Sequence, residues 1–263
     1  MTNTHFCDVQ AKTCAEGSAT TCHGMRPLFR LSAEYELVLA SGSPRRRQFL
    51  NEWGLPFRLE LAEAEEPRPA PDEAPEAYTR RAATAKALAV GQNLLQNPVS
   101  PHAAGFAPLP VILAADTVVA VDGDILGKPE SPAHALNMLE RLNGTSHEVI
   151  SAVCLLLPAQ HEAMAACSTL PGLHMQETVE DCFRMLSFSD VSRVYFHRWP
   201  QPVLQAYVDT GEPSDKAGAY AIQGQGAVLV ERVEGSWSTV VGLPVTPLAQ
   251  IMINLGIMRP YGA

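Results

Sequence analysis

Four polar clusters interrupt an otherwise apolar chain, each at the end of an expected strand or in a glycine-rich turn. They are residues 41–46, Glu65-Glu66, Asp116-Thr117 with Lys128, and Asp215-Lys216 with Gln223. Cations in such positions bind phosphate groups, and carboxylates hold a divalent metal ion or activate a water molecule. Because open α/β sheets bind ligands at strand ends, we expect the clusters to converge on one anionic substrate.

The first cluster follows a short apolar run and reads LVLASGSPRRR over Leu37–Arg47. This pattern predicts a buried strand, a tight turn in which Ser41 or Ser43 caps a helix, and a helix that begins at Pro44. Three arginines then crowd the positive end of the helix dipole, where cations are disfavoured. A polyanion bound at the helix N-terminus would remove that conflict, and a solvated basic patch is the alternative.

Each cluster also has an ordinary structural interpretation. Asp116 can simply end a strand, Lys128 can be a solvated loop lysine, Glu65-Glu66 can be a charged loop end, and Asp215-Lys216 can be an exposed ion pair of little energetic value. The serines lack the GxSxG pattern of serine hydrolases, and the chain contains neither a P-loop nor a GxGxxG motif. No single cluster therefore establishes a function.

Composition restricts the class of protein. The chain has 263 residues and a net charge of −9, which argues against a general nucleic-acid coat but allows one local basic pocket. No apolar run is long enough to span a bilayer, and the N-terminus lacks the pattern of a signal peptide. We therefore expect a soluble cytoplasmic protein without disulfides, and the spacing of Cys7, Cys14, Cys22 and His23 fits no usual zinc site.

Strand and helix patterns alternate along the chain and predict an α/β fold with a mixed sheet. The expected strands are 37–40, 57–62, 111–115, 118–121, 149–157, 191–197, 219–222 and 227–233, and the expected helices are 44–53, 74–95, 132–142, 202–210 and 248–255. Asp122-Gly123-Asp124 predicts a hairpin turn. Residues 1–33 are expected to form a flexible extension in which Met25 is a second candidate start, and about 158–190 an insertion.

Six segments, taken together, resemble the Maf family of nucleotide pyrophosphatases, whose shape is like that of the inosine triphosphate pyrophosphatases. They are Leu39-Ala-Ser-Gly-Ser-Pro-Arg-Arg46, Ala115-Asp-Thr-Val-Val119, Gly127-Lys-Pro129, Leu142-Asn-Gly-Thr-Ser-His147, residues 211–224 and Val241-Gly-Leu-Pro244. The resemblance implies one domain over residues 36–258, with a mixed twisted sheet flanked by helices and a central cleft.

The resemblance also implies an activity: hydrolysis of a nucleoside triphosphate to the monophosphate and pyrophosphate with Mg²⁺ or Mn²⁺. Asp116 falls on the family's catalytic position as the general base, and Glu66 with Asp116 would hold the metal ion. The substrate-binding positions fall on Ser41, Arg45, Arg46, Lys86, Lys128, Asp215 and Lys216.

Arg45, Thr117 and Gln223 fall on the positions that set base specificity, and they match the branch that acts on dTTP and UTP, including modified pyrimidine nucleotides. A 7-methyl-GTP pyrophosphatase and a nucleotide-binding regulator of cell division with little turnover are the alternatives. The intact Asp116, Lys128 and Lys216 weigh against an inactive regulator. We expect no nucleic-acid or membrane partner, and a homodimer stays open.

Overall fold

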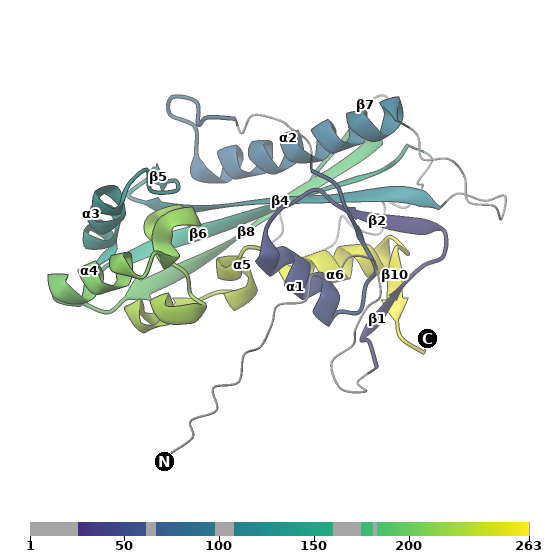
Figure 1. The fold of residues 1–263 in the computed structure, drawn as a ribbon. Coiled ribbons are helices and arrows are strands. Elements are labelled where there is room, and N and C mark those ends of the chain that lie inside the picture. Colours follow the sequence, from purple (N-terminus) through teal and green to yellow (C-terminus); the bar gives the residue numbers. More distant parts are fainter. Residues whose placement is uncertain (1–25, 62–66, 98–107, 160–174, 181–182, 263) are drawn as a thin grey trace, which may run out of the picture.

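A mixed β-sheet forms the centre of the protein in the computed structural model, which describes residues 26–61, 67–97, 108–159, 175–180 and 183–262. The sheet order is β3-β2-β4-β6-β8-β7, with β5 on β4 and β9 on β8. The strands are β2 (Tyr35–Leu39), β3 (Arg58–Leu59), β4 (Leu109–Val121), β5 (Asp124–Leu126), β6 (Ser146–Pro158), β7 (Met175–Glu180), β8 (Phe183–Phe196) and β9 (Val230–Glu234). β2 is parallel to β3 and β4, and the remaining pairs are antiparallel. The predicted α/β fold is confirmed (Figure 1).

Helices cover both faces of this sheet. Helix α2 (Pro75–Gln96) lies on one face, and α1 (Pro44–Glu52) and α6 (Val245–Asn254) lie on the other (Figure 1). Side chains alternate between the faces along each strand. In β4, Ile112 and Ala114 pack with the α2 cluster, whereas Leu113 and Ala115 pack with the cluster that includes α1 and α6.

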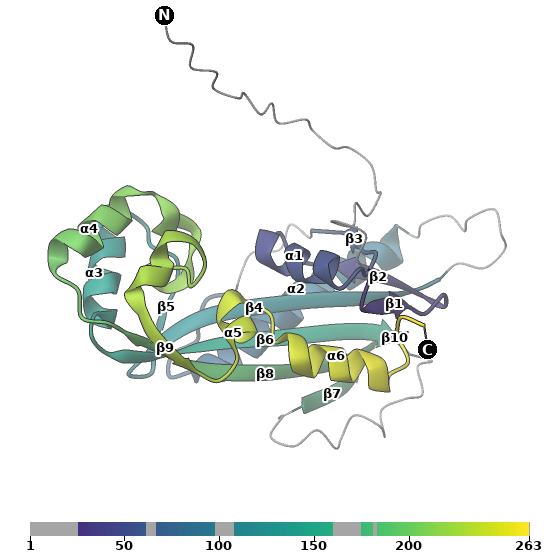
Figure 2. The ribbon, with the colours of Figure 1, turned by 90° about the horizontal axis from the view of Figure 1, so that it is seen from below.

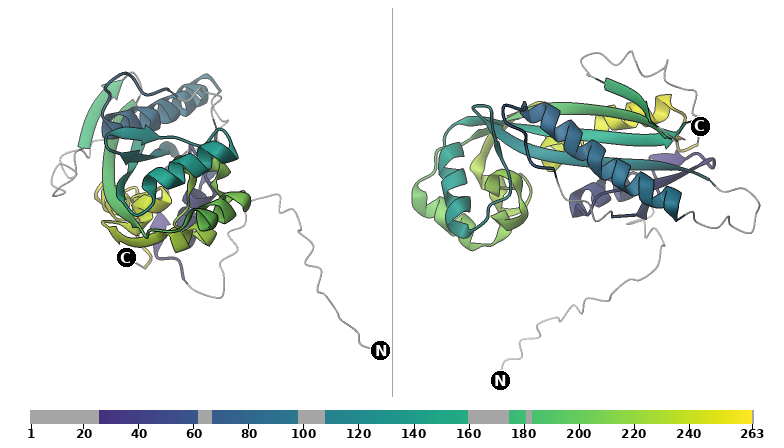
Figure 3. Two further views of the ribbon diagram at one scale, coloured as in Figure 1. Left: turned by 90° about the vertical axis from the view of Figure 1, so that its left-hand side faces the viewer. Right: turned by 90° about the horizontal axis from the view of Figure 1, so that it is seen from above.

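A second helical group closes one end of the sheet. It contains α3 (Pro132–Leu142), α4 (Gln201–Asp209) and three 3₁₀ turns, η3 (Glu212–Asp215), η4 (Ala217–Ala219) and η5 (Gly224–Leu229). Figure 2 shows the long strands β4, β6 and β8 running from this group to α6, and Figure 3 shows α2 crossing above them. The long strands therefore connect two apolar clusters, one around α1 and α6 and one around α3 and α4.

Local sequence signals placed several elements correctly. Helix α1 begins at Pro44 with extended Ser43 before it, although the Ser43 side chain makes no capping hydrogen bond. Helix α3 has the predicted bounds, and the Ser131 side chain caps it by accepting from His134 N–H. Between β4 and β5, Asp122 and Gly123 have φ values of 53° and 86°, which a two-residue type I′ hairpin requires.

Other expectations about the elements were wrong. The segment 219–222 is not a strand, because Gly218 and Ala219 have positive φ (67° and 58°) and turn the chain away from an extended path. Of the strand expected at 227–233, only the part from Val230 onward belongs to β9. β8 begins at Phe183, inside the segment expected to be an insertion.

Three short elements carried no clear sequence signal. β1 (Phe29–Leu31) pairs antiparallel with β10 (Met258–Pro260), so residues 29–31 are ordered although the flexible extension was expected to reach residue 33. Helix α5 (Trp237–Val241) lies between β9 and α6. Residues 1–25, which include most of that extension, lie outside the described residues.

Candidate active site

The site lies where one edge of β4 loses its strand neighbour. β2 pairs with β4 as far as Leu113, and β5 pairs with it from Val119 onward. In the described part of the chain, residues 114–118 therefore have no strand partner on that edge. A cavity of about 640 Å³ opens here, and Asp116 and Thr117 line it. The predicted central cleft corresponds to this cavity.

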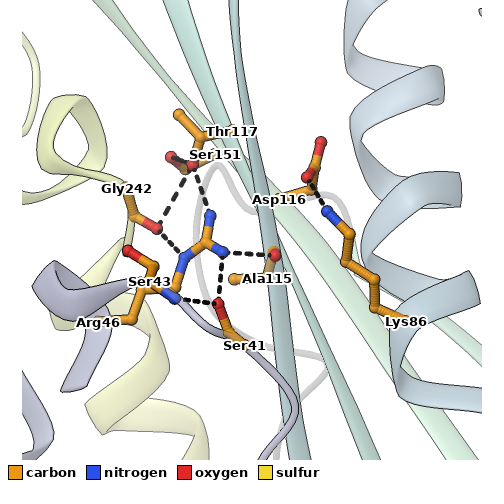
Figure 4. A network of polar contacts seen from close by, with 9 residues as sticks. All are labelled: Ser41, Ser43, Arg46, Lys86, Ala115, Asp116, Thr117, Ser151 and Gly242. Atoms are coloured by element: carbon orange, nitrogen blue, oxygen red, sulfur yellow. Dashed lines mark hydrogen bonds and ion pairs between the residues drawn. The ribbon is translucent and has the colours of Figure 1, made fainter. Parts of the chain in front are cut away.

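Arg46 fills part of the gap and is the most heavily bonded side chain of the site (Figure 4). Its guanidinium donates from Nη1 to the Ala115 carbonyl (2.8 Å) and to Ser41 Oγ (2.9 Å). Nε donates to the Gly242 carbonyl (2.8 Å), and Nη2 donates to Thr117 Oγ1 (3.0 Å). Only 9% of Arg46 is exposed. Arg46 lines the cavity as predicted. Because its donors are bonded to oxygens of the protein, it joins the start of α1 to β4 and to the segment at Gly242.

Thr117 continues that buried network away from the cavity. Its hydroxyl is 2.8 Å from Ser151 Oγ on β6, and Ser151 donates to the Thr239 carbonyl at 2.7 Å. The register of the strands places Thr117 opposite Ser151 and Ser151 opposite Asp190 on β8. The Thr239 hydroxyl in turn donates to Asp190, so hydrogen bonds link β4, β6 and β8 to α5.

Asp116 points to the opposite face of β4 from Thr117 (Figure 4). Lys86 of α2 approaches it, with Nζ 2.5 Å from Oδ1. The Asp116 side chain is 8% exposed and that of Lys86 is 29% exposed. The sequence predicted both residues in one site, and the structure brings them into direct contact at the cavity wall. The ion pair orients a nearly buried carboxylate at the open edge of the strand.

Arg45 differs from its neighbour Arg46. It also lines the cavity, but its Nε is buried and has no hydrogen-bond partner among the described residues. The first turn of α1 contains no acidic side chain that would offset the arginines. Arg45 therefore presents positive charge to the cavity at the N-terminus of α1, where an anionic group is favoured.

The opposite wall comes from the segment after α4. Asp215, Lys216 and Gln223 line the cavity, and so does Lys128, which precedes α3. Lys216 forms an ion pair with Asp215, and this hydrogen bond is the main reason that the pKa of Asp215 lies below its usual value. The charge of Arg45 lowers the pKa of Asp215 further, which shows that the two walls interact electrostatically.

Tyr220 also lines the cavity, and no role in the site was predicted for it. Its hydroxyl is 2.8 Å from Nε2 of His147, whose ring packs edge-to-face against Tyr220 and Phe196. Burial lowers the pKa of His147 to about 4, so the imidazole is neutral. His147 and Tyr220 both fall in segments that resemble the family, but no local pattern in either segment indicates that they contact each other.

All but one of the predicted site residues line this one cavity. The exception is Glu66, which lies outside the described residues. Sequence analysis missed Ser151, Tyr220 and Gly242. Ser151 is the only hydroxyl-bearing residue in the apolar run Val149–Leu157, which was an available signal.

The described residues that line the cavity offer few of the oxygen ligands that a divalent cation needs. Within the described ranges no three His, Cys, Asp or Glu side chains gather to form a closed metal site. Mg²⁺ in nucleotide sites is, however, commonly held by one or two carboxylates together with waters and the substrate's own phosphates. Asp116 on the cavity wall fits such a shared set, whereas it does not fit a metal site built from protein ligands alone.

A cavity at a strand edge that combines two carboxylates, Asp116 and Asp215, with several cations is typical of α/β proteins that bind a phosphorylated small molecule. A family model described as "Maf-like protein" matches residues 36–255. This chain belongs to the Maf-like family.

Several relatives match over most of the chain. A protein of Oleidesulfovibrio alaskensis named dTTP/UTP pyrophosphatase is 46% identical, over 88% of this chain and 90% of its own length. Proteins of the same name from Nitratidesulfovibrio vulgaris and Methylococcus capsulatus are 44% and 40% identical, over 87% and 85% of this chain and 91% and 93% of their lengths. Among the described residues, no helix combines the length and apolarity that crossing a membrane requires.

Proposed function

We propose that this chain is a nucleoside triphosphate pyrophosphatase that hydrolyses dTTP and UTP to the monophosphate and pyrophosphate. The observation that carries the proposal is the meeting of Asp116 with Lys86, Arg45, Lys128 and Lys216 in one cavity. Relatives that share most of the chain carry the name of this activity. Neither the 7-methyl-GTP alternative nor the regulatory alternative has a comparable observation in its favour.

In the proposed reaction Asp116 accepts a proton from water as the water oxygen attacks a phosphorus of the α–β linkage. The bond from that phosphorus to the bridging oxygen breaks, and the electron pair leaves with the departing phosphate group. Lys86 holds the carboxylate in place through its ion pair. Cations that face the leaving group balance the charge that develops there, which is a major source of catalysis in phosphoryl transfer.

Mg²⁺ or Mn²⁺ would be held by Asp116 and the substrate's phosphates, and when bound it would neutralise part of the triphosphate charge. Ser41 and Arg45 at the start of α1 would bind phosphate oxygens, and Arg46 would keep this wall in place through its bonds to Ser41 and Ala115. Thr117 and Gln223 would contribute to base selectivity. An amide both donates and accepts, which suits a pyrimidine edge.

We propose that the protein acts in the cytoplasm. Its substrates would be free nucleotides rather than nucleic acid. The net charge of −9 supports small-molecule binding in a local basic pocket over general binding of nucleic acid. A homodimer stays open.

The experiment that tests this proposal is a panel of nucleoside triphosphates with Mg²⁺ or Mn²⁺, scored separately for pyrophosphate and orthophosphate. We expect pyrophosphate from UTP and dTTP and much slower turnover of purine triphosphates. Orthophosphate as the first product would replace the proposal with another phosphohydrolase activity. Turnover of 7-methyl-GTP above that of UTP would place the chain in the other branch.

A further inference from the structure

A carboxylate outside the cavity organises the wall that carries Gln223. Glu212 lies in η3, and its Oε1 accepts from the Tyr207 hydroxyl and from Gly226 N–H, both at 3.0 Å. Its Oε2 accepts from Gln225 N–H at 3.0 Å. The Tyr207 hydroxyl also accepts from Ala221 N–H at 3.2 Å. Glu212 thus holds one end of the segment 221–226 directly and the other end through the Tyr207 hydroxyl.

The two glycines of this segment fit around that contact. A Cβ at Gly224, where φ is +77°, would lie 2.7 Å from Glu212 Oε2. A Cβ at Gly226 would lie 2.5 Å from the Tyr207 hydroxyl and 2.5 Å from the Ala221 carbonyl. The Gly224-Gln-Gly226 sequence, which matches no nucleotide-binding motif, is therefore explained by the close approach of the carboxylate and the phenol.

The pKa shifts indicate that the Glu212 carboxylate, which anchors the segment 221–226, stays charged. Burial acts to raise the pKa of Glu212, but the N–H groups of Gln225 and Gly226, the Tyr207 hydroxyl and the charge of Lys216 together outweigh it, so the pKa lies below its usual value. Burial raises the pKa of Tyr207, so its hydroxyl stays protonated and donates to the carboxylate. Hydrogen bonds to a charged acceptor are stronger than hydrogen bonds between neutral groups.

The anchor connects two stretches of the cavity wall without facing the cavity itself. Ala221, Ile222 and Gln223 line the cavity on one side of the network, and Asp215 and Lys216 line it on the other. Glu212 is three residues before Asp215 in the same 3₁₀ turn. A shift of the Glu212 side chain would therefore move the Gln223 amide relative to Lys216.

We propose that Glu212 is a positioning residue for base selectivity, which fixes the Gln223 segment relative to the Asp215–Lys216 turn. This inference rests on the proposed function, because selectivity is defined only for an active pyrophosphatase. The ligand class is a pyrimidine with a carbonyl at position 4, which differs from cytosine in the hydrogen bond it offers to an amide. Glu212 acts through Gln223 and does not contact the substrate.

The test is Glu212→Gln, which keeps the shape but places an NH₂ group against one of the donors. The ratio of kcat/KM for UTP over CTP should fall about tenfold, the equivalent of one lost hydrogen bond of about 1.4 kcal/mol. KM for UTP should rise, and kcat should stay within about threefold, because the chemistry belongs to Asp116. Amide hydrogen exchange over residues 221–229 should become faster.

Glu234→Gln is the matched control, because Glu234 also accepts from a tyrosine hydroxyl (Tyr195, 2.9 Å) but lies on exposed β9 outside the cavity lining. It should leave the UTP-over-CTP ratio unchanged. Tyr207→Phe is the second variant in case Glu212→Gln does not fold, and it should lower the ratio in the same direction because Ala221 N–H loses its acceptor.

The outcomes distinguish failure of the proposed function from failure of the inference about Glu212. A wild-type chain that releases no pyrophosphate from any nucleoside triphosphate overturns the proposed function and the inference together. An active wild type whose Glu212→Gln and Tyr207→Phe variants keep the wild-type ratio overturns only the inference. Equal loss of selectivity in Glu234→Gln would also overturn it, because the effect would then not depend on the anchor.

Discussion

The two sides of β4 differ in how far their polar groups are already paired. On the α2 side, Asp116 contacts Lys86 beside the open cavity. On the other side, Thr117 and Arg46 are bonded to each other, to Ser151 and to the carbonyls of Ala115 and Gly242. Adjacent residues of a strand face opposite sides of the sheet, so the neighbours Asp116 and Thr117 have different roles although they belong to one motif. We infer that the first side performs the chemistry and the second side builds the wall.

The largest expected effect comes from the α2 side. Asp116→Asn keeps the shape of the side chain but removes the general base, so kcat/KM for UTP should fall by about 10²–10⁴. The melting temperature should change little, and pyrophosphate release is the measurement. Asp124→Asn is the control, because Asp124 is an exposed residue of the β4–β5 hairpin that pairs with Arg141. Full activity of Asp116→Asn would remove Asp116 from the role of base.

The pH dependence of stability reports on His147, which contacts the cavity-lining residue Tyr220. Its pKa is about 4 in the folded chain, below the unfolded value of 6.5, because burial disfavours the imidazolium. Between these values the unfolded chain binds more protons, so the stabilisation that is present above pH 6.5 is lost as the pH falls toward 4. The shift corresponds to about 3 kcal/mol.

The measurement is the free energy of unfolding by denaturant from pH 7 to pH 4, for wild type and for His147→Gln. Subtracting the two curves removes the carboxylate titrations that both proteins share. The wild type should lose about 3 kcal/mol more than the variant over this range. Parallel curves would mean that His147 titrates in the folded chain as it does in water.

A smaller effect is expected at Thr117. Thr117→Val removes the hydroxyl that accepts from Arg46 and contacts Ser151, and the free energy of unfolding should fall by about 1–2 kcal/mol because buried partners lose their bonds. Thr117→Ser keeps the hydroxyl and serves as the control. Unchanged stability of Thr117→Val, with a change only in the choice between UTP and CTP, would contradict the structural role of the Thr117 hydroxyl and leave it with base selectivity alone.

Sequence patterns predicted the parts of this molecule that depend on neighbouring residues. The start of α1 at Pro44, the bounds of α3 and the type I′ turn at Asp122-Gly123 follow from local backbone preferences. The resemblance to a family supplied the site residues, and all of them that the structure describes line one cavity.

The remaining features depend on contacts far apart in sequence. The pairing of β1 with β10 joins residues more than 200 positions apart, and three-residue strands leave little pattern to detect. The four-way bonding of Arg46 could not be read from its motif, because its acceptors include the carbonyls of Ala115 and Gly242. The strand expected at 219–222 is interrupted at its first residue, where Ala219 has a positive φ next to Gly218, and a Cβ at Gly218 would lie only 2.8 Å from Val119, 99 positions earlier in the chain.

The most direct test of the division of tasks is the same substitution at two neighbouring positions, Arg45→Lys and Arg46→Lys. Lysine keeps the charge but cannot make the fork of bonds that Arg46 makes. We expect Arg46→Lys to lose about 3 kcal/mol of unfolding free energy, since buried acceptors are left without donors. We expect Arg45→Lys to keep its stability within about 0.5 kcal/mol and to raise KM for UTP. Equal stability of the two variants, with only KM changed in both, would contradict this division of tasks.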